Sequence, residues 1–367
     1  MARIELVDLA HAYGNGRGAG APSYALHPFS LAWEDGGAYA LLGPSGCGKT
    51  TLLNIISGLL VPSQGRVRFD GADVTELSPQ RRNIAQVFQF PVIYDTMTVR
   101  DNLAFPLRNR GVDEAAIRRR VGTIAEMLEL SGQLDRRAAG LAADAKQKIS
   151  LGRGLVRDDV AAVLFDEPLT VIDPHLKWQL RRKLKQIHHE LKLTLIYVTH
   201  DQIEALTFAD RVVVMSEGRV MQSGTAEELF ERPRHTFVGH FIGSPGMNLL
   251  PATVDASGLR VAGSTLAGAL DAPRLAGLSR AKRLVLGVRP EYLDLAPEGA
   301  PGSVQATVLR RQDIGTGLLL TAEAGGQVLR ARLPADRAAD APAPGGTVRL
   351  ALLGEHTCFY DDEVLIP

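Results

Sequence analysis

Short apolar runs alternate with helical patterns over residues 1–235 of the chain. Each run is bounded by polar or glycine positions, which is typical of strands buried on both faces of a parallel sheet. We expect such strands at Tyr39–Leu42, Ala161–Phe165, Leu195–Val198 and Arg211–Met215. Strands that alternate with helices predict an α/β domain with a largely parallel sheet.

A helical segment interrupts this alternation. Residues Asp113 to Leu130 carry apolar positions at helical spacing, with Arg118, Arg119 and Arg120 on the polar side. We therefore expect a helical subdomain inserted at about residues 90–157 of the first domain.

The composition changes after Pro245, where glycine, alanine and proline separate short alternating stretches. These stretches predict strands at Arg283–Val288, Ser303–Leu309 and Thr347–Leu353. Proline and charge interrupt the periodicity at residues 232–235, so a second domain is expected at 236–367. We expect it to be an all-β barrel or sandwich.

Charge and cysteine content narrow the possible partners. The 367 residues include 41 basic and 41 acidic side chains, so no net charge favours nucleic acid as a partner. Two cysteines give neither a disulfide framework nor a metal-ligand spacing, which fits a reducing compartment. The chain start does not resemble a signal peptide, and no run approaches the roughly 20 apolar residues that span a bilayer. We expect a peripheral position at any membrane, without insertion.

One glycine-rich segment fits the phosphate-binding pattern G-x-x-x-x-G-K-[ST]: Gly43, Pro44, Ser45, Gly46, Cys47, Gly48, Lys49 and Thr50. It follows an expected strand and precedes the apolar helix expected at Thr51–Leu60, so a chance glycine-rich turn explains it poorly. Backbone N–H groups and the helix N-terminus would hold the phosphates of ATP. Lys49 would reach the β- and γ-phosphates, the Thr50 hydroxyl would bind Mg²⁺, and Thr51 would border the nucleotide.

Two carboxylates follow the expected strand Ala161–Phe165, at the edge of a parallel sheet where ligands bind. Asp166 is placed to hold Mg²⁺, directly or through water, and Glu167 to polarise the attacking water. The alternative, an acidic turn before Pro168, becomes a poor explanation once a phosphate-binding loop is present.

A histidine follows the expected strand Leu195–Val198 at the same kind of edge. A neutral His200 imidazole could hydrogen-bond a γ-phosphate and detect its loss. Taken alone, a histidine in this position is more often a structural residue.

These segments occur in the order of the motif set of ABC-transporter ATPases, which the chain resembles. The resemblance implies that Gln89 contacts Mg²⁺ and the attacking water and couples to a membrane subunit. It further implies that Asp173 belongs to the D-loop, that His200 is the switch histidine, and that Tyr13 stacks on adenine. Core packing remains the alternative for Tyr13.

The C-terminal half resembles a narrower group. Phe241–Asn248 and Gly287–Glu291 resemble the junction and the OB-like regulatory domain of maltose-type sugar and polyol importers. Leu141–Val156 and residues 167–174 look most like an ATPase subunit of bacterial glycerol importers. That resemblance implies a place on the cytoplasmic face of the bacterial inner membrane. It also implies two membrane permease subunits as partners and a solute-binding protein as an indirect one.

The chain departs from the family at its signature, L-S-G-G-Q, which here reads Leu141-Ala142-Ala143-Asp144-Ala145. In the family this segment binds the γ-phosphate held by a partner ATPase. Ala142 has no hydroxyl to donate, while Asp144 suits a helix N-cap or, pointing outward, opposes the nucleotide's charge. We therefore expect a heterodimer with a second, different ATPase.

Other functions stay open on the sequence alone. The chain could be a regulatory subunit that binds ATP and hydrolyses it poorly, or a soluble ABC ATPase that acts on nucleic acid. The apolar run Phe90–Tyr94 after Gln89 could receive a membrane subunit or pack in the core.

Overall fold

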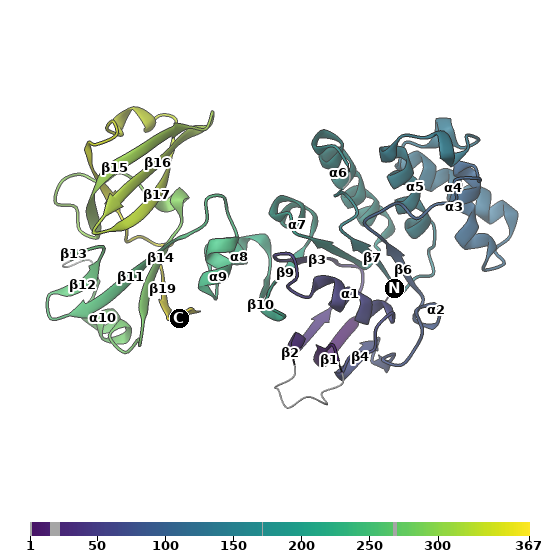
Figure 1. Ribbon diagram of the computed structural model, residues 1–367, viewed down its shortest axis with the longest axis horizontal. Helices are drawn as coiled ribbons and strands as arrows, with labels where there is room; N and C mark the ends of the chain where they lie inside the picture. The colour runs from purple at the N-terminus through teal and green to yellow at the C-terminus, as the bar shows by residue number, and fades with distance from the viewer. Residues whose placement is uncertain (1, 15–22, 171, 267–269) are drawn as a thin grey trace. The chain divides into compact units, whose positions relative to one another are not determined.

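The computed structural model describes residues 2–14, 23–170, 172–266 and 270–367. The chain divides into two compact units, residues 1–226 and 227–367 (Figure 1). The division falls after Ala226 rather than after residue 235, because α8 (Ala226–Glu231) is tied to the second unit. The guanidinium of Arg289 donates hydrogen bonds to the carbonyl oxygens of Leu229, at 3.2 Å, and Phe230.

A six-stranded sheet forms the centre of the first unit, in the order β10-β9-β3-β8-β7-β6. Its five strands from β9 to β6 are parallel, and only β10 pairs antiparallel. The bounds are β3 Ala38–Leu42, β6 Ile84–Val87, β7 Ala162–Asp166, β8 Leu195–Thr199, β9 Arg211–Ser216 and β10 Arg219–Gly224. The expected strands are therefore present, with ends shifted by at most one residue.

A second, antiparallel sheet in the order β2-β1-β4-β5 faces the same core. Its strands are β1 Ile4–Ala12, β2 Tyr24–Trp33, β4 Gln64–Phe69 and β5 Ala72–Asp73. Helix α1 (Lys49–Ser57) contributes Leu52, Leu53, Ile55 and Ile56 to one apolar cluster that also contains residues of both sheets. The helix ends before the expected Leu60, because Gly58 adopts a left-handed φ of 83° and its N–H caps the last turn.

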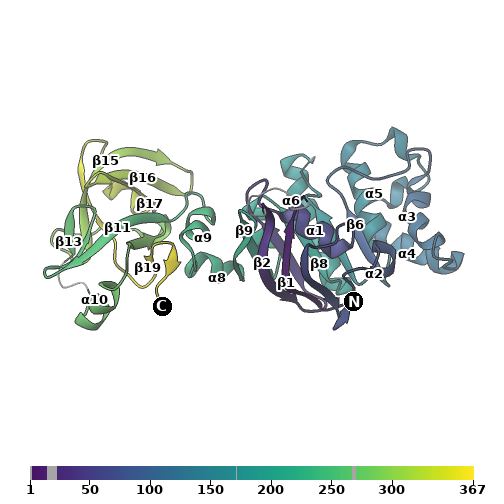
Figure 2. The same ribbon diagram turned by 60° about the horizontal axis from the view of Figure 1, so that its bottom comes forward.

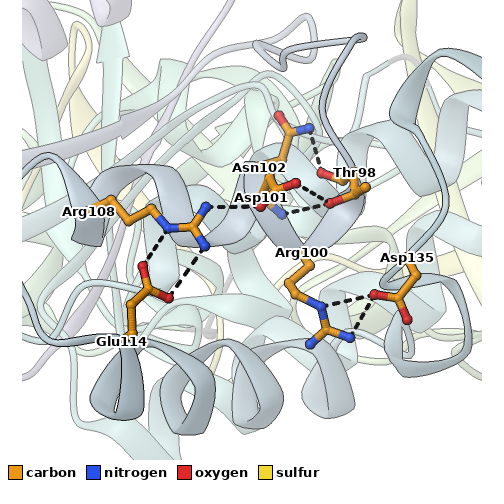
Figure 3. Close-up of polar contacts among 7 residues, drawn as sticks. All are labelled: Thr98, Arg100, Asp101, Asn102, Arg108, Glu114 and Asp135. Carbon is orange, nitrogen blue, oxygen red and sulfur yellow. Dashed lines mark hydrogen bonds and ion pairs between the residues drawn. The ribbon is translucent and has the colours of Figure 1, made fainter.

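Three helices make up the inserted part of the first unit: α3 (Val99–Arg108), α4 (Glu114–Met127) and α5 (Ala143–Leu155), with α5 packed beside β6 (Figure 2). Figure 3 shows Arg108 bridging Asp101 on α3 and Glu114 on α4, while Arg100 pairs with Asp135. These pairs are solvent-exposed, so each contributes at most about 1 kcal/mol. They orient the helices, and the buried apolar faces hold them together.

The other helices of the first unit are α2 (Pro79–Arg82), α6 (Pro174–Leu191) and α7 (Gln202–Phe208). Arg82 is buried and donates hydrogen bonds to the carbonyl oxygens of Ile55 (2.5 Å) and Ile56 (2.8 Å) at the end of α1. Burial lowers the pKa of Arg82 to about 10. Arg82 thus gives the Ile55 carbonyl a second donor beside the Gly58 N–H, which reaches it at 3.2 Å, and also donates to the Ile56 carbonyl.

The second unit is built on two antiparallel sheets, in the orders β13-β12-β11-β14-β19-β20 and β17-β16-β15-β18. Both contribute to one apolar core, which confirms the expected β-rich fold. A short helix, α10, whose N-terminus is capped by Asp271, contributes Leu278 to this core. The bounds are β11 Asn248–Asp255, β12 Gly258–Val261, β13 Ser264–Leu266, α10 Ala272–Leu278, β14 Leu284–Val288, β15 Ser303–Asp313, β16 Gly317–Ala324, β17 Gln327–Pro334, β18 Thr347–Ala351, β19 Cys358–Asp361 and β20 Val364–Leu365.

Arg289 holds the start of the second unit together. It is 1% exposed. The guanidinium donates a hydrogen bond to the carbonyl of Ile242 at 2.5 Å, the residue that follows α9 (Thr236–Phe241). It also donates to the carbonyl groups of α8. The guanidinium also lies over the Phe230 ring, 4.0 Å from its centroid. Two short helices without a large apolar face of their own are thereby fixed against β14.

Candidate nucleotide site

Strand register brings the expected site segments to one edge of the parallel sheet. Leu42 at the end of β3 pairs with Thr199 at the end of β8, and Asp166 at the end of β7 pairs with Val198. The phosphate-binding loop, the acidic pair and His200 each follow one of these strand ends. The carboxyl edge of a parallel sheet is where α/β folds bind ligands.

The phosphate-binding loop requires glycine at both ends. A Cβ on Gly43 would lie 2.2 Å from the carbonyl oxygen of Met215, a distance that only a glycine avoids. Gly48, at the N-cap of α1, has φ 100°, and a Cβ there would meet the Ala25 carbonyl oxygen at 2.7 Å. The loop can therefore pass close to β2 and β9 and still point its N–H groups toward an anion.

Lys49 is drawn into the loop. Its side chain is 5% exposed, and Nζ donates hydrogen bonds to the carbonyl oxygens of Gly43 (2.8 Å) and Pro44 (3.0 Å). Cys47 Sγ lies 3.9 Å from the same ammonium, and burial raises the pKa of this thiol. A fixed positive charge therefore lies beneath the N–H groups of the loop.

A cavity of about 310 Å³ opens above the loop. Eight of the expected site residues line it together with Ala25; they are Tyr13, Ser45, Gly46, Gly48, Lys49, Thr50, Thr51 and Glu167. Tyr13 is 61% exposed and its hydroxyl lies 3.0 Å from Thr51 Oγ1, so core packing does not explain this aromatic residue. Its ring is available for stacking at the rim of the cavity.

The acidic pair lies beside the loop. Burial and the neighbouring Glu167 raise the pKa of Asp166, while Lys49 and a hydrogen bond from the Thr50 hydroxyl oppose that shift. A hydroxyl and a carboxylate side by side form a hard-oxygen donor set of the kind that Mg²⁺ takes alongside phosphate oxygens.

Glu167 is held in an unusual backbone conformation, with φ 47°. A left-handed non-glycine residue costs on the order of 1–3 kcal/mol, and such residues occur in turns as well as at functional sites. One carboxylate oxygen lies 3.1 Å from Nδ1 of His200, and the other accepts a hydrogen bond from the Thr170 hydroxyl at 3.2 Å. A carboxylate and an imidazole in contact can orient and polarise a water molecule.

Seven expected site residues are not part of the cavity lining: Gly43, Pro44 and Cys47 of the loop, Asp166, His200, Gln89 and Asp173. Gln89 is half-buried, two residues beyond the end of β6. Asp173 is exposed and caps α6, accepting a hydrogen bond from the N–H of His175 at 3.0 Å. Within the described residues of this single chain, neither borders the space above the phosphate-binding loop.

The signature segment, Leu141–Ala145, differs from the sequence-based expectation. Helix α5 has Ala142 as its N-cap, without a side-chain hydrogen bond, and Asp144 is the second helical residue. An N-cap at Asp144 is therefore wrong. The N-cap is the residue immediately before the first helical residue, and the first helical residue here is Ala143. Asp144 places a half-buried carboxylate in the first turn of the helix, where it does not act as the N-cap.

Sequence reasoning missed Gln147, which is fully buried and donates a hydrogen bond from Nε2 to the Pro168 carbonyl at 2.5 Å. It also missed Ala25, whose backbone approaches Gly48 from β2. A buried glutamine on a helix rich in small and charged residues gives no periodic signal that would have identified it.

Three family models match the chain: ABC transporter at residues 26–170, MalK OB fold domain at 243–293 and TOBE domain at 286–359. Curated relatives named sn-glycerol-3-phosphate import ATP-binding protein UgpC are similar along nearly the whole length. The protein from Salmonella typhi is 40% identical, with 94% of this chain and 95% of the relative covered. The protein from Paraburkholderia xenovorans is 39% identical, with 92% and 93% covered.

Solved structures agree on the fold of the first unit. The structure of cbiO1 from Clostridium perfringens, part of the ABC transporter complex cbiONQ, matches with TM-score 0.56 and 28% identity over 62% of this chain and 90% of that one. The ADP conformation of MJ1267, an ATP-binding cassette of an ABC transporter, shares the fold with TM-score 0.54, 24% identity and 64% and 96% coverage.

The chain therefore belongs to the ATPases of ABC transporters. With its OB and TOBE domains it is, more narrowly, an ATP-hydrolysing subunit of the importer type. No helix among the described residues is long and apolar enough to cross a bilayer.

Proposed function

We propose that this ATPase powers uptake of glycerol or a related polyol or sugar, and that it does so in an asymmetric pair with a second, different ATPase. The names of the relatives, which specify import of sn-glycerol-3-phosphate, support a small polyol or its phosphate as the solute class. Two membrane permease subunits and, indirectly, a solute-binding protein complete the importer. The chain lies at the cytoplasmic face of the bacterial inner membrane, attached through those permeases.

ATP binds with its phosphates on the loop Gly43–Thr50 and its adenine on Tyr13. Thr50, Asp166 and Gln89 would hold Mg²⁺, which would supply positive charge against the phosphates. Glu167 polarises the attacking water, while His200 contacts the γ-phosphate. The contact between Glu167 and His200 at 3.1 Å supports this assignment, since the two residues follow the ends of the neighbouring strands β7 and β8.

An apolar surface beside Gln89 supports the link to the permeases. Phe90, Val92 and Tyr94 are 68%, 53% and 41% exposed, so these side chains do not pack in the core. Arg153 orders this surface from α5, since its guanidinium lies 4.7 Å from the Tyr94 ring centroid and donates a hydrogen bond to the Val92 carbonyl at 2.9 Å. Adjacent exposed apolar residues of this kind mark a docking surface, here for a permease segment.

The signature segment is the observation that carries the heterodimer. Ala142 presents no hydroxyl, and Asp144 adds a negative charge to the helix end that would meet a partner's nucleotide. At about 5 Å and an effective dielectric of about 20, a carboxylate and one phosphate charge repel by roughly 3 kcal/mol. A partner with an intact signature completes the site built on Lys49 and Glu167, whereas two copies of this chain would form two defective sites.

ATPase assays on the purified chain, alone and with its companion ATPase and permeases, test the pairing. We expect slow turnover alone and fast turnover in the mixed assembly, where Glu167→Gln abolishes most of it. The signature is restored by Ala142→Ser, Ala143→Gly, Asp144→Gly and Ala145→Gln. Removing a repulsion of roughly 3 kcal/mol should raise the rate of the isolated chain about a hundredfold, because each 1.4 kcal/mol is about a factor of ten.

Asp135→Gly is the matched control, because it removes an exposed carboxylate from the same inserted region. It should leave the rate of the isolated chain unchanged. Robust turnover by the unmodified chain alone, equal to that of the restored chain, would contradict the heterodimer.

A further inference from the structure

Gln147 connects the signature helix to the segment that carries Glu167. It lies in α5, five residues after the N-cap Ala142, and its side chain is 0% exposed. Nε2 donates a hydrogen bond to the carbonyl oxygen of Pro168 at 2.5 Å. A carbonyl only accepts hydrogen bonds, so the amide must present its NH₂ group to Pro168, and the orientation of the side chain is fixed.

The burial of this amide is not explained by packing. Gln147 Oε1 is buried with no hydrogen-bond partner among the described residues. An apolar side chain of similar volume would avoid the penalty of an unpaired buried oxygen. What Gln147 adds over such a side chain is its donor to Pro168.

The contact falls on a backbone turn that determines where the Glu167 carboxylate points. Glu167 has φ 47°, its N–H donates to the Val198 carbonyl at 3.0 Å, and its own carbonyl accepts from the Thr170 N–H at 3.2 Å. These two bonds fix the peptides on either side of Glu167 to β8 and within the turn. Gln147 fixes the next carbonyl, that of Pro168, from a different element.

We propose that Gln147 is a positioning residue for ATP hydrolysis, which holds the Glu167 turn through the Pro168 carbonyl. The inference rests on the proposed role of Glu167 in polarising water. Because α5 begins at the signature segment, the same hydrogen bond makes the orientation of that helix and the placement of the carboxylate depend on each other. A shift of α5 along its axis would pull directly on the turn.

Three variants in the assembled importer test this. Gln147→Leu keeps the volume and removes the donor, Gln147→Glu restores a donor only when protonated, and Lys148→Ala removes a polar contact to Glu129 from the outer face of the same helix. We expect Gln147→Leu to lower kcat about tenfold, with KM for ATP and binding of a fluorescent ATP analogue within twofold of the unmodified protein. Lys148→Ala should change none of these quantities.

The pH profile separates positioning from packing. The carboxyl group that Gln147→Glu introduces can donate to Pro168 when it is protonated but not when it is ionised. The ratio of kcat for Gln147→Glu to kcat for the unmodified protein should therefore rise as pH falls. The ratio for Gln147→Leu should stay flat. A flat ratio for both variants would overturn the proposal. If Gln147→Leu fails to bind the analogue, the profile of Gln147→Glu decides alone.

A double variant tests whether the effect passes through Glu167. In a Glu167→Gln background, adding Gln147→Leu should leave the residual rate unchanged, because residues that act as a unit are not additive. A further tenfold loss would overturn the proposal. If Glu167→Gln itself leaves the rate intact, the proposed role of Glu167 fails, and that result is distinct from an additive loss.

Discussion

The carboxylate of Glu167 is held by side chains on two sides. Nδ1 of His200 lies 3.1 Å from Oε1, and the Thr170 hydroxyl donates to Oε2 at 3.2 Å. Thr170 lies in the same turn, three residues after Glu167, so this hydrogen bond does not require distant parts of the chain to be brought together. Its contribution is to limit rotation of the carboxylate about its last bond.

We predict that Thr170→Ala lowers kcat for ATP about tenfold, which corresponds to roughly 1.5 kcal/mol, the lower end of the range for one hydrogen bond to a charged group. Thr170→Ser should restore the rate, because it keeps the hydroxyl and removes only a methyl group. Steady-state hydrolysis and nucleotide binding in the assembled importer measure both effects. If the serine variant is as slow as the alanine variant, the hydroxyl is not responsible.

The sequence predicts the candidate site residues where a buried strand leads into them, but it does not predict which residue begins a helix. The phosphate-binding loop, Asp166, Glu167 and His200 each follow a strand that the apolar pattern indicates, so their convergence follows from a parallel sheet. The cap at Asp144 was wrong because capping depends on which residue begins a helix, and patterns place that residue only within a few positions.

At the scale of elements, two buried arginines perform the same task in different units. Arg82 satisfies carbonyl groups at the end of α1, and Arg289 satisfies carbonyl groups of α8 and after α9. Burial lowers the pKa of Arg289, and its charge is compensated by backbone oxygens and the Phe230 ring. Neither role could be predicted from sequence, because arginine is normally an exposed residue.

We predict that Arg289→Met destabilises the second unit by about 3 kcal/mol, because several buried carbonyl groups lose their donor at once. Arg283→Met is the matched control, since Arg283 has a 78% exposed side chain and forms only a surface ion pair with Asp362. Its effect should stay within about 0.5 kcal/mol. Urea unfolding followed by circular dichroism measures both, and equal shifts would refute the role of Arg289.

Seven strands were expected from their apolar patterns and are present, as β3, β7, β8, β9, β14, β15 and β18. The antiparallel sheet β2-β1-β4-β5 and the helix ends were not expected. Helix α1 stops at Ser57 although the apolar pattern continues to Leu60, because a left-handed glycine ends it. Similarly, α10 begins where Asp271 caps a segment whose composition indicated only loops and strands. In each case one residue at the helix end overrides the pattern, Gly58 through its left-handed backbone and Asp271 through its capping side chain.

At the scale of the whole molecule, each unit has a core of its own. One buried apolar cluster contains residues only of the first unit, and another only of the second. Units with separate cores can unfold separately. The chain also provides a selective probe, since its two tryptophans, Trp33 and Trp178, both belong to the first unit.

We predict two thermal transitions. Saturation with ATP and Mg²⁺ at about 100 times Kd should stabilise the transition seen by tryptophan fluorescence by roughly 2.7 kcal/mol. The second transition, seen only by circular dichroism, should not move with nucleotide and should be the one that Arg289→Met lowers. A nucleotide-dependent shift of both transitions would mean that the units unfold as one.

The contact between His200 and Glu167 affects which nitrogen of the imidazole carries the hydrogen. A neutral imidazole has one N–H group. If that N–H is at Nδ1 and donates a hydrogen bond to the Glu167 carboxylate, Nε2 has only a lone pair and can only accept. A terminal phosphate oxygen needs a hydrogen, so the ring as it stands would meet that oxygen with the wrong polarity. If His200 contacts the γ-phosphate as proposed, arrival of the triphosphate must rotate the ring, exchange its tautomer or add a second hydrogen. Rotation or exchange would release the Glu167 carboxylate to bind water.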